Sequence, residues 1–387
     1  MAAQRQTKLG PVLASIVAIG FGLLLSPLSR QYPLFRWITV IVPSSIGLVP
    51  SLTRHRWAYS FEEVRSTDLR GQSALVTGGN SGIGFQICRA LSRQGASVTI
   101  ACRNPQRCFA AVDEIRKDDG YSGAPISPLI MDVSDLTSVQ MAAKAYLQNN
   151  DNPLDMLFLN AGIASAKSEK GATQLPTTKD GIEKVFATNV VGHHLLYRLL
   201  EPALQNSTMA RVVSTSSVAS IWFLTSYGLP YFGNDTSSLI PSTLEKLNEG
   251  SSSFTKSVML YGRSKLAQVA WSNALNRRLS DKSNIYVNAF HPGAVETPMV
   301  KKHISPFLPE FLVNTMSYIN QRLLWTAEEG ALTGIYLGVA TDEIRSNNLR
   351  GRYFHPQSVE FDHPHMKDEE LQENLWRLCE ESVQNFL

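Results

Sequence analysis

Two side chains in the second half of the chain have the types and spacing that proton transfer needs. Tyr261 and Lys265 are four residues apart, so a helix places both side chains on one face, one turn apart. A free tyrosine has a pKa of about 10, and a positive charge beside it favours the tyrosinate. Such a pair could exchange a proton with a hydroxyl or carbonyl group. Because many solvated helices contain the same spacing, the rest of the chain must decide.

A glycine-rich stretch near the start of the globular part has the composition of a phosphate-binding turn. It reads Thr77-Gly78-Gly79-Asn80-Ser81-Gly82-Ile83-Gly84 and follows a short apolar run. Glycines permit a tight turn and let the backbone approach a pyrophosphate, while the start of the next helix offers N–H groups to the phosphates. Taken alone, the stretch is equally compatible with an ordinary strand-to-helix turn.

These groups must be positioned by strands and helices that alternate from about residue 68 onward. Each candidate strand is short and apolar, as expected for a strand that is buried on both faces. The predicted strands are residues 73–77, 97–101, 127–131, 156–159, 211–215, 285–290 and 351–354. The predicted helices are residues 85–93, 180–200, 261–279 and 327–339. The pattern predicts an α/β fold with a doubly wound parallel sheet of the Rossmann type.

Further motifs follow the glycine-rich turn in a fixed order. They are Asn160-Ala161-Gly162, Asn189 within ATNVVGHHLL, a serine pair within RVVSTSSVAS, and Tyr261-Gly262-Arg263-Ser264-Lys265. Together with the spacing G-x-x-x-G-x-G in TGGNSGIG, this series resembles the short-chain dehydrogenase/reductase family. The stretches NVVGHHLLYRLLEPAL, YGRSKLAQ and VNAFHPGAVETPM resemble its membrane-associated, retinol-dehydrogenase-like branch. The resemblance extends from about residue 68 to residue 385.

The resemblance implies a catalytic set of Asn189, Ser217, Tyr261 and Lys265, with Ser216 as the alternative serine. Tyr261 would take the hydroxyl proton during oxidation and return it during reduction, while a hydride passes between substrate and nicotinamide. Ser217 would hold the reacting oxygen by a hydrogen bond. The resemblance further implies that Lys265 binds the nicotinamide ribose and that Asn189 holds a water molecule in a proton relay.

The same resemblance implies where the cofactor binds. The set is Gly78, Asn80, Ser81, Gly82, Ile83, Gly84, Arg103, Asp132, Val133, Asn160, Ala161, Gly162, Tyr261, Lys265, Pro292, Gly293, Val295 and Thr297. Enzymes that prefer NAD place an acid at the end of the second strand, whereas NADP users offer an arginine to the 2'-phosphate. Here Arg103 follows that strand and no acid is nearby, so NADP(H) is the predicted cofactor.

Charge and cysteine patterns argue against other functions. The formal net charge is +3, and the basic residues beyond residue 60 alternate with acidic ones, so no nucleic-acid partner is expected. The four cysteines include no C-x-x-C pair and no histidines at zinc spacing, so no metal site is predicted. We interpret all four as buried or incidental thiols in a reducing compartment.

The first sixty residues predict a membrane anchor. Residues 9–29 carry no charge, and a helix of that length reaches about 31 Å, against about 30 Å for a bilayer core. Residues 37–52 are shorter and contain two prolines, which favours an interfacial or re-entrant segment. We therefore expect an anchor at 1–60 and a catalytic domain at 68–387. A cleaved signal peptide and a buried core helix are the alternatives.

Basic residues around these apolar runs predict the orientation. Six basic residues flank the runs, namely Arg5, Lys8, Arg30, Arg36, Arg54 and Arg56. Because four of them follow the first run, the positive-inside bias places the catalytic domain in the cytosol. The expected location is the endoplasmic reticulum membrane.

The substrate prediction rests on aromatic segments and on the predicted anchor. Residues 222–254 are an insertion relative to the retinol-dehydrogenase-like branch. Aromatic side chains in this insertion and in residues 306–325 suit an apolar pocket or membrane-facing lip, and equally an ordinary core. With the anchor they favour a lipophilic alcohol or carbonyl substrate, namely a retinoid, sterol, polyprenoid or long-chain aldehyde. An idle NADP(H)-binding sensor or scaffold and a reductase of carbon–carbon double bonds are alternatives, and a homodimer is left open.

Overall fold

The computed structural model describes the chain from residue 64 onward, with gaps. The described residues are 64, 66–150, 152–166, 174–222, 239–250, 254–279, 283–293, 295 and 325–387. All belong to the second of two compact units, Arg56–Leu387, whereas the first unit is Met1–His55. The predicted membrane segments at 9–29 and 37–52 lie outside the described residues. Within the described ranges, no helix has both the length and the apolar character that crossing a membrane requires.

The described strands form one sheet in the order β3-β2-β1-β4-β5-β6-β7-β8. They are β1 (Ser73–Thr77), β2 (Ser97–Cys102), β3 (Ile126–Ile130), β4 (Met156–Leu159), β5 (Ala210–Thr215), β6 (Ile285–Phe290), β7 (Tyr353–His355) and β8 (Val359–Glu360). All neighbours are parallel except β8, which is antiparallel to β7. Every predicted strand is confirmed, three with the predicted bounds and four with small shifts of their ends. The prediction missed β8, which is too short to give an apolar pattern.

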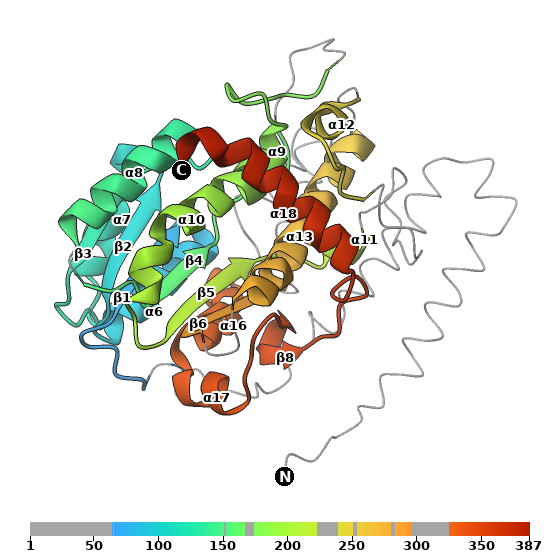
Figure 1. Ribbon diagram of the computed structural model, residues 1–387. Coiled ribbons are helices and arrows are strands. Elements are labelled where there is room, and N and C mark those ends of the chain that lie inside the picture. Colours follow the sequence, from blue (N-terminus) through green and yellow to red (C-terminus); the bar gives the residue numbers. More distant parts are fainter. Residues whose placement is uncertain are drawn as a thin grey trace, which may run out of the picture. The chain divides into compact units, whose positions relative to one another are not determined.

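Helices cover both faces of the sheet (Figure 1). One face carries α6 (Gly82–Arg93), α7 (Pro105–Arg116) and α16 (Ala327–Val339), and the other carries α8 (Leu136–Asn149), α10 (Gly192–Gln205) and α13 (Phe254–Arg278). In β1, Ala74 and Val76 pack into the first layer and Leu75 into the second. Successive side chains of a strand point to opposite faces, so a strand covered on both sides is apolar throughout. The Rossmann-like α/β fold with a parallel sheet is thereby confirmed.

Shorter elements connect these layers. They are α9 (Lys184–Phe186), the π-helical turn η1 (Ala187–Val191), α11 (Ala219–Trp222), α12 (Leu244–Asn248), α17 (Thr341–Ser346) and the 3-10 turns η3 (Pro356–Ser358) and η4 (Gln384–Phe386). The predicted helix over residues 180–200 is confirmed with shifted ends, because helical structure runs from Lys184 to Gln205 and includes the π-helical turn. Its start moves because the Glu183 carboxylate accepts the backbone N–H groups of Val185 and Phe186 and so caps α9. The π-helical turn that follows contains Asn189, and such turns are frequent at functional sites.

The C-terminal helix α18 (Glu369–Val383) lies along α13 (Figure 1). Trp376 stacks with Trp271 of α13 at 6.5 Å between ring centroids. The Arg278 guanidinium lies 4.4 Å from the Trp376 ring, and Glu380 pairs with Arg198 of α10. Helix α18 therefore packs over α10 and α13. Its position depends on contacts between residues that are far apart in the sequence.

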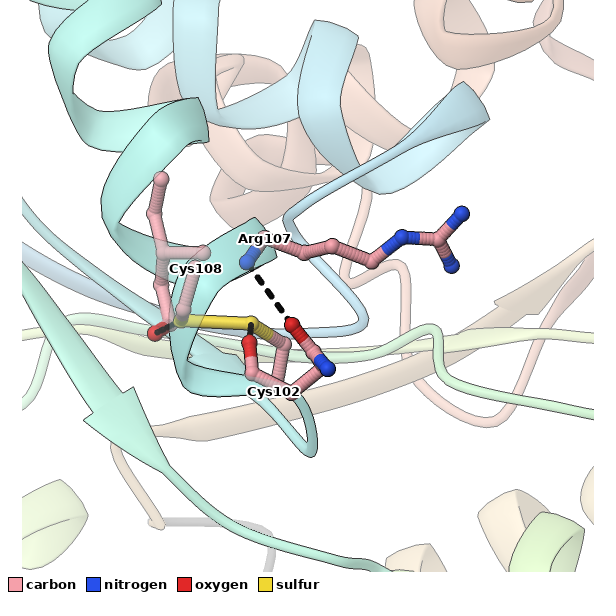
Figure 2. The surroundings of a disulfide bond; sticks show 5 residues. Cys102, Arg107 and Cys108 are labelled. Carbon is pink, nitrogen blue, oxygen red and sulfur yellow. Dashed lines mark hydrogen bonds between the residues drawn. A yellow bond between two sulfur atoms is a disulfide. The ribbon is translucent and has the colours of Figure 1, made fainter.

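Cys102 and Cys108 form a disulfide at the end of β2 (Figure 2). Cys102 ends the strand, and Cys108 lies in the first turn of α7. The Asn104 side chain caps α7 by accepting the Arg107 backbone N–H at 2.9 Å, and this tight turn brings the two cysteine Cα atoms to 5.9 Å. The interpretation of all four cysteines as thiols is therefore wrong for this pair. Cys88 and Cys379 are free and buried.

Candidate active site

The predicted site residues follow the carboxyl ends of β1 to β6. Because these strands are parallel, the segments after them meet at one edge of the sheet. The strand order reverses between β1 and β4, and open α/β sheets bind ligands in the crevice at such a point. The glycine-rich turn, Arg103, the Asn160-Ala161-Gly162 segment, Ser217 and Pro292 all reach this edge.

The glycine-rich turn brings the start of α6 to the crevice. Gly78 has a φ of +66°, in the left-handed region that glycine favours. At Gly84, a Cβ atom would lie 2.5 Å from both the Gly78 carbonyl oxygen and Asn160 Nδ2, so any side chain would push the turn away. Ser81 makes no side-chain cap, and the first turn of α6 contains no acid. The N–H groups of Gly82, Ile83 and their neighbours thus suit an anion such as a pyrophosphate.

Thr77 ties this turn to a second predicted segment, a role that the sequence analysis missed. Its hydroxyl oxygen accepts the backbone N–H groups of Asn160 and Ala161, both at 2.9 Å. Asn160 Nδ2 in turn donates to the Thr77 carbonyl at 3.0 Å. Gly162 continues the segment beside the Asn189 side chain. The predicted ribose-binding segment is therefore held against β1 by hydrogen bonds within the protein.

His193 is a second residue that the sequence analysis missed. Its Nδ1 lies 3.1 Å from the Asn189 carbonyl, and its Nε2 lies 2.9 Å from the Thr77 hydroxyl. Because a carbonyl only accepts, Nδ1 carries the proton and Nε2 accepts from Thr77. Burial lowers the pKa of His193 to about 4, so the ring is neutral at neutral pH. Its position one helical turn after Asn189 was the available signal.

Arg103 and Asp132 face each other where the adenosine half of a cofactor would lie. Arg103 Nη1 is 3.6 Å from Asp132 Oδ2, and the arginine side chain is 72% exposed. Asp132 Oδ1 accepts the backbone N–H and the hydroxyl of Ser134, at 2.9 and 2.7 Å. Val133 beside it is buried. The arginine is accessible to a ligand, while the aspartate keeps its own turn in place.

Tyr261 of α13 and Ser217 after β5 lie near each other, because the Ser217 side chain acts to lower the pKa of Tyr261. Ser216 is buried, and its hydroxyl donates to the Lys265 backbone carbonyl at 2.7 Å. Of the two candidate serines, Ser217 therefore lies beside the tyrosine. Ser216 instead fastens α13 to the end of β5.

Lys265 lies close to Tyr261, with Nζ 5.5 Å from the ring centroid. It donates to the Thr215 carbonyl at 2.8 Å and to Gln268 Oε1 at 2.9 Å. Burial lowers the pKa of Lys265 to about 7. Burial also raises the pKa of Tyr261 to about 12, and the Ser217 side chain only partly offsets this. In the protein without cofactor, desolvation therefore raises the pKa of Tyr261, against the expected acidification.

Asn189 is fully buried, and its side chain holds the segment after Gly162. Its Oδ1 accepts the Ile163 N–H at 2.9 Å, and its Nδ2 donates to the Ile163 carbonyl at 2.9 Å and to the Ser264 hydroxyl at 2.8 Å. Ser264 lies on α13 immediately before Lys265. The structure thereby brings the four predicted catalytic residues together from η1, the end of β5 and α13.

The nicotinamide side of the predicted set is described in part. Pro292 and Val295 are buried, Gly293 is half-buried, and Val295 forms a β-bridge with Trp325. Thr297 lies outside the described residues, together with residues 223–238 of the insertion and residues 296–324. The role of the aromatic side chains there stays a prediction.

Comparison with known proteins places this arrangement in a family. The model of the short chain dehydrogenase family matches residues 72–228. Retinol dehydrogenase 14 of Mus musculus is 33% identical over 324 residues, which cover 81% of this chain and 86% of that protein. The WW domain-containing oxidoreductase of Homo sapiens is 31% identical over 343 residues, which cover 87% of this chain and 74% of that protein. The chain belongs to the short-chain dehydrogenase family.

Membership makes this protein an oxidoreductase that binds a nicotinamide cofactor. The resemblance to the retinol-dehydrogenase-like branch is confirmed by these relatives. The structure of L-sorbose reductase from Gluconobacter frateurii, complexed with NADPH and L-sorbose, has a TM-score of 0.55 at 17% identity. The matched region covers 77% of this chain and 99% of the L-sorbose reductase chain. This likeness shows the common fold.

Proposed function

We propose that the protein is an NADP(H)-dependent alcohol dehydrogenase or carbonyl reductase that acts on a lipophilic substrate. The observation that carries the proposal is the meeting of Tyr261, Ser217 and Lys265 at the carboxyl edge of the sheet, beside the glycine-rich turn. A hydroxyl that can give up a proton, a second hydroxyl near it and a buried ammonium group are the parts that proton exchange with a substrate oxygen needs.

The cofactor would be held by the groups that lie open at this edge. The start of α6 offers N–H groups to the pyrophosphate, and the close approach of Gly84 to Gly78 leaves the backbone accessible. Lys265 has a third proton on Nζ beyond those given to Thr215 and Gln268, which suits a ribose hydroxyl. The nicotinamide supplies or accepts the hydride when it is bound.

Tyr261 would move the proton through its Oη atom. With a pKa raised to about 12 the phenol keeps its proton, so in the protein alone it is prepared to donate to a carbonyl oxygen. In the opposite direction it must accept a hydroxyl proton, and the positive charges of Lys265 and of the oxidised nicotinamide would favour the tyrosinate. Ser217 would orient the reacting oxygen by a hydrogen bond from its own hydroxyl, beside Tyr261.

The preference for NADP(H) rests on Arg103. Its guanidinium is exposed after β2, where a 2'-phosphate would lie, and no acid at the end of that strand would compete for a ribose hydroxyl. A guanidinium binds phosphate oxygens with two parallel hydrogen bonds. L-Sorbose reductase, which shares the fold, is complexed with NADPH in its structure, and this supports the same preference here.

A lipophilic substrate is supported by the relatives and by the sequence. Two relatives are named retinol dehydrogenases 14 and 13, and the uncharged run at 9–29 would keep the enzyme at a membrane. The proposal includes the endoplasmic reticulum, with the catalytic unit in the cytosol. Glycosylation tests this orientation, because Asn206-Ser207-Thr208 is an acceptor sequence with Asn206 exposed after α10. A sugar at Asn206 would place the unit in a lumen instead.

The deciding experiment follows NADPH oxidation at 340 nm with a panel of retinoid, sterol, polyprenoid and long-chain carbonyl compounds. Tyr261→Phe should lower turnover by about 10²- to 10⁴-fold and leave NADPH binding unchanged, because only the proton donor is lost. Tyr286→Phe, within the buried strand β6, is the matched control. Equal turnover of Tyr261→Phe and wild type would refute the proposed chemistry. Tight NADPH binding without any turnover would indicate a sensor.

A further inference from the structure

The Gln268 side chain lies between two parts of the catalytic centre. Its Oε1 accepts from Lys265 Nζ at 2.9 Å, and its Nε2 donates to the Asn189 backbone carbonyl at 3.0 Å. Gln268 follows Lys265 by three residues on α13, so the two side chains share a helix face, whereas Asn189 belongs to the π-helical turn η1. The amide is 3% exposed. One buried side chain thus links the lysine to the turn that carries the asparagine.

The backbone carbonyl and the side chain of Asn189 both contact protein groups around Lys265. A carbonyl oxygen has two lone pairs, and that of Asn189 accepts from Gln268 Nε2 and from His193 Nδ1. Both protons of Asn189 Nδ2 are given to Ile163 and Ser264.

We propose that Gln268 is a positioning residue whose amide bridges Lys265 and the Asn189 carbonyl and so fixes the ammonium group beside Tyr261. The inference rests on the proposed function, since it assigns the support of the same catalytic lysine. The bridge holds the charge and the geometry of the lysine. Gln268 acts through Lys265 and touches no substrate.

The surroundings of Lys265 explain why one neutral acceptor matters. Of the described titratable side chains around it, Tyr261 on α13, His193 on α10 and His291 after β6 are all neutral at neutral pH. The oxygens of Thr215 and Gln268 that accept its ammonium protons are neutral as well. Hydrogen bonds to the charged form favour it, so losing one acceptor should make the lysine lose its proton at lower pH.

Two substitutions at Gln268 should move this titration in opposite directions. Gln268→Met keeps the length of the side chain and removes both hydrogen bonds, so the titration midpoint of Lys265 should fall by about one pH unit. Gln268→Glu keeps an oxygen for Lys265 and adds a negative charge, so the midpoint should rise. Ser272→Ala is the control, because Ser272 is equally buried one turn further along α13 and bonds only to the Gln268 carbonyl.

The measurement is the pH titration of the Lys265 ε-carbon by NMR in the full chain labelled with ¹³C-lysine, without cofactor. The signal is assigned by its loss in Lys265→Arg, and thermal unfolding confirms that each variant is folded. If an active substrate is found, the high-pH limb of kcat should move with the same signs while KM changes less than twofold. Unchanged midpoints in folded Gln268→Met and Gln268→Glu would overturn the inference. Absence of turnover in wild type would refute the proposed function alone, because the titration needs no activity.

Discussion

The two halves of the candidate site differ in how their polar groups are satisfied. On the cofactor side, Arg103 is 72% exposed, Ser81 is exposed, and the start of α6 has no side-chain cap. On the catalytic side, Asn189 and Lys265 are buried, and each is bonded to protein groups far away in the sequence. The polar groups of the cofactor side, here called the open half, are exposed to a ligand. Those of the catalytic side, the closed half, are bonded to other groups of the protein.

Because of this difference, substitutions in one half should change ligand affinity and substitutions in the other should change the stability of the fold. An open polar group gains its partner only when a ligand binds, so removing it changes binding and leaves folding almost untouched. A closed network leaves a buried donor or acceptor without a partner when one member is removed, which costs about 1 to 3 kcal/mol for each orphaned group. Substitutions in the two halves should therefore have different signatures.

Acid should affect the closed half most strongly. Burial holds the pKa of His193 at about 4, below its ordinary value of 6.5, so protonation is easier in the unfolded chain. The resulting stability is complete above pH 6.5 and is lost as the pH falls from 6.5 toward 4, to a total of about 3 kcal/mol. Urea unfolding at several pH values measures it. His193→Gln should flatten this part of the profile, and identical slopes for both proteins would contradict the assignment.

Thr77 sharpens the comparison because it touches both halves. Thr77→Val keeps the shape of the side chain and leaves His193 Nε2 and two backbone N–H groups without the hydroxyl. With three groups orphaned, the free energy of unfolding should fall by about 3 kcal/mol, and NADPH binding should weaken as well.

The control for Thr77 is Thr99→Val in β2. Thr99 is buried too, but its hydroxyl has no hydrogen bond in the described part of the chain. If both variants lose the same stability, the Thr77 network contributes nothing beyond burial of the side chain.

Arg103 should show the smallest effect, confined to binding. Arg103→Ala should weaken NADPH about tenfold, leave NADH unchanged, and alter the free energy of unfolding by less than about 0.5 kcal/mol, because its ion pair with Asp132 is exposed. Fluorescence titration with each cofactor measures the difference. Arg107→Ala, on the exposed side of α7, should change neither affinity. An equal loss for NADH would mean that Arg103 does not recognise the 2'-phosphate.

Prediction succeeded where the signal was local. The strands at 73–77, 156–159 and 285–290 have the predicted bounds because an apolar run covered on both faces is visible in the sequence itself. It was incomplete where the geometry of a cap or turn decided. The helix predicted at 180–200 begins only after the Glu183 cap and contains a π-helical turn, and the cysteine pair at 102 and 108 needed the turn geometry after β2.

The sequence by itself determined the fold class, the place of the glycine-rich turn and the one-turn spacing of Tyr261 and Lys265, because each depends on residues close together in the chain. Only the tertiary structure decided which serine faces Tyr261, and that Gln268, His193 and Thr77 support the site. It also revealed that burial raises the pKa of Tyr261. Desolvation and hydrogen bonds between distant segments exist only after the chain has folded, so no local pattern records them.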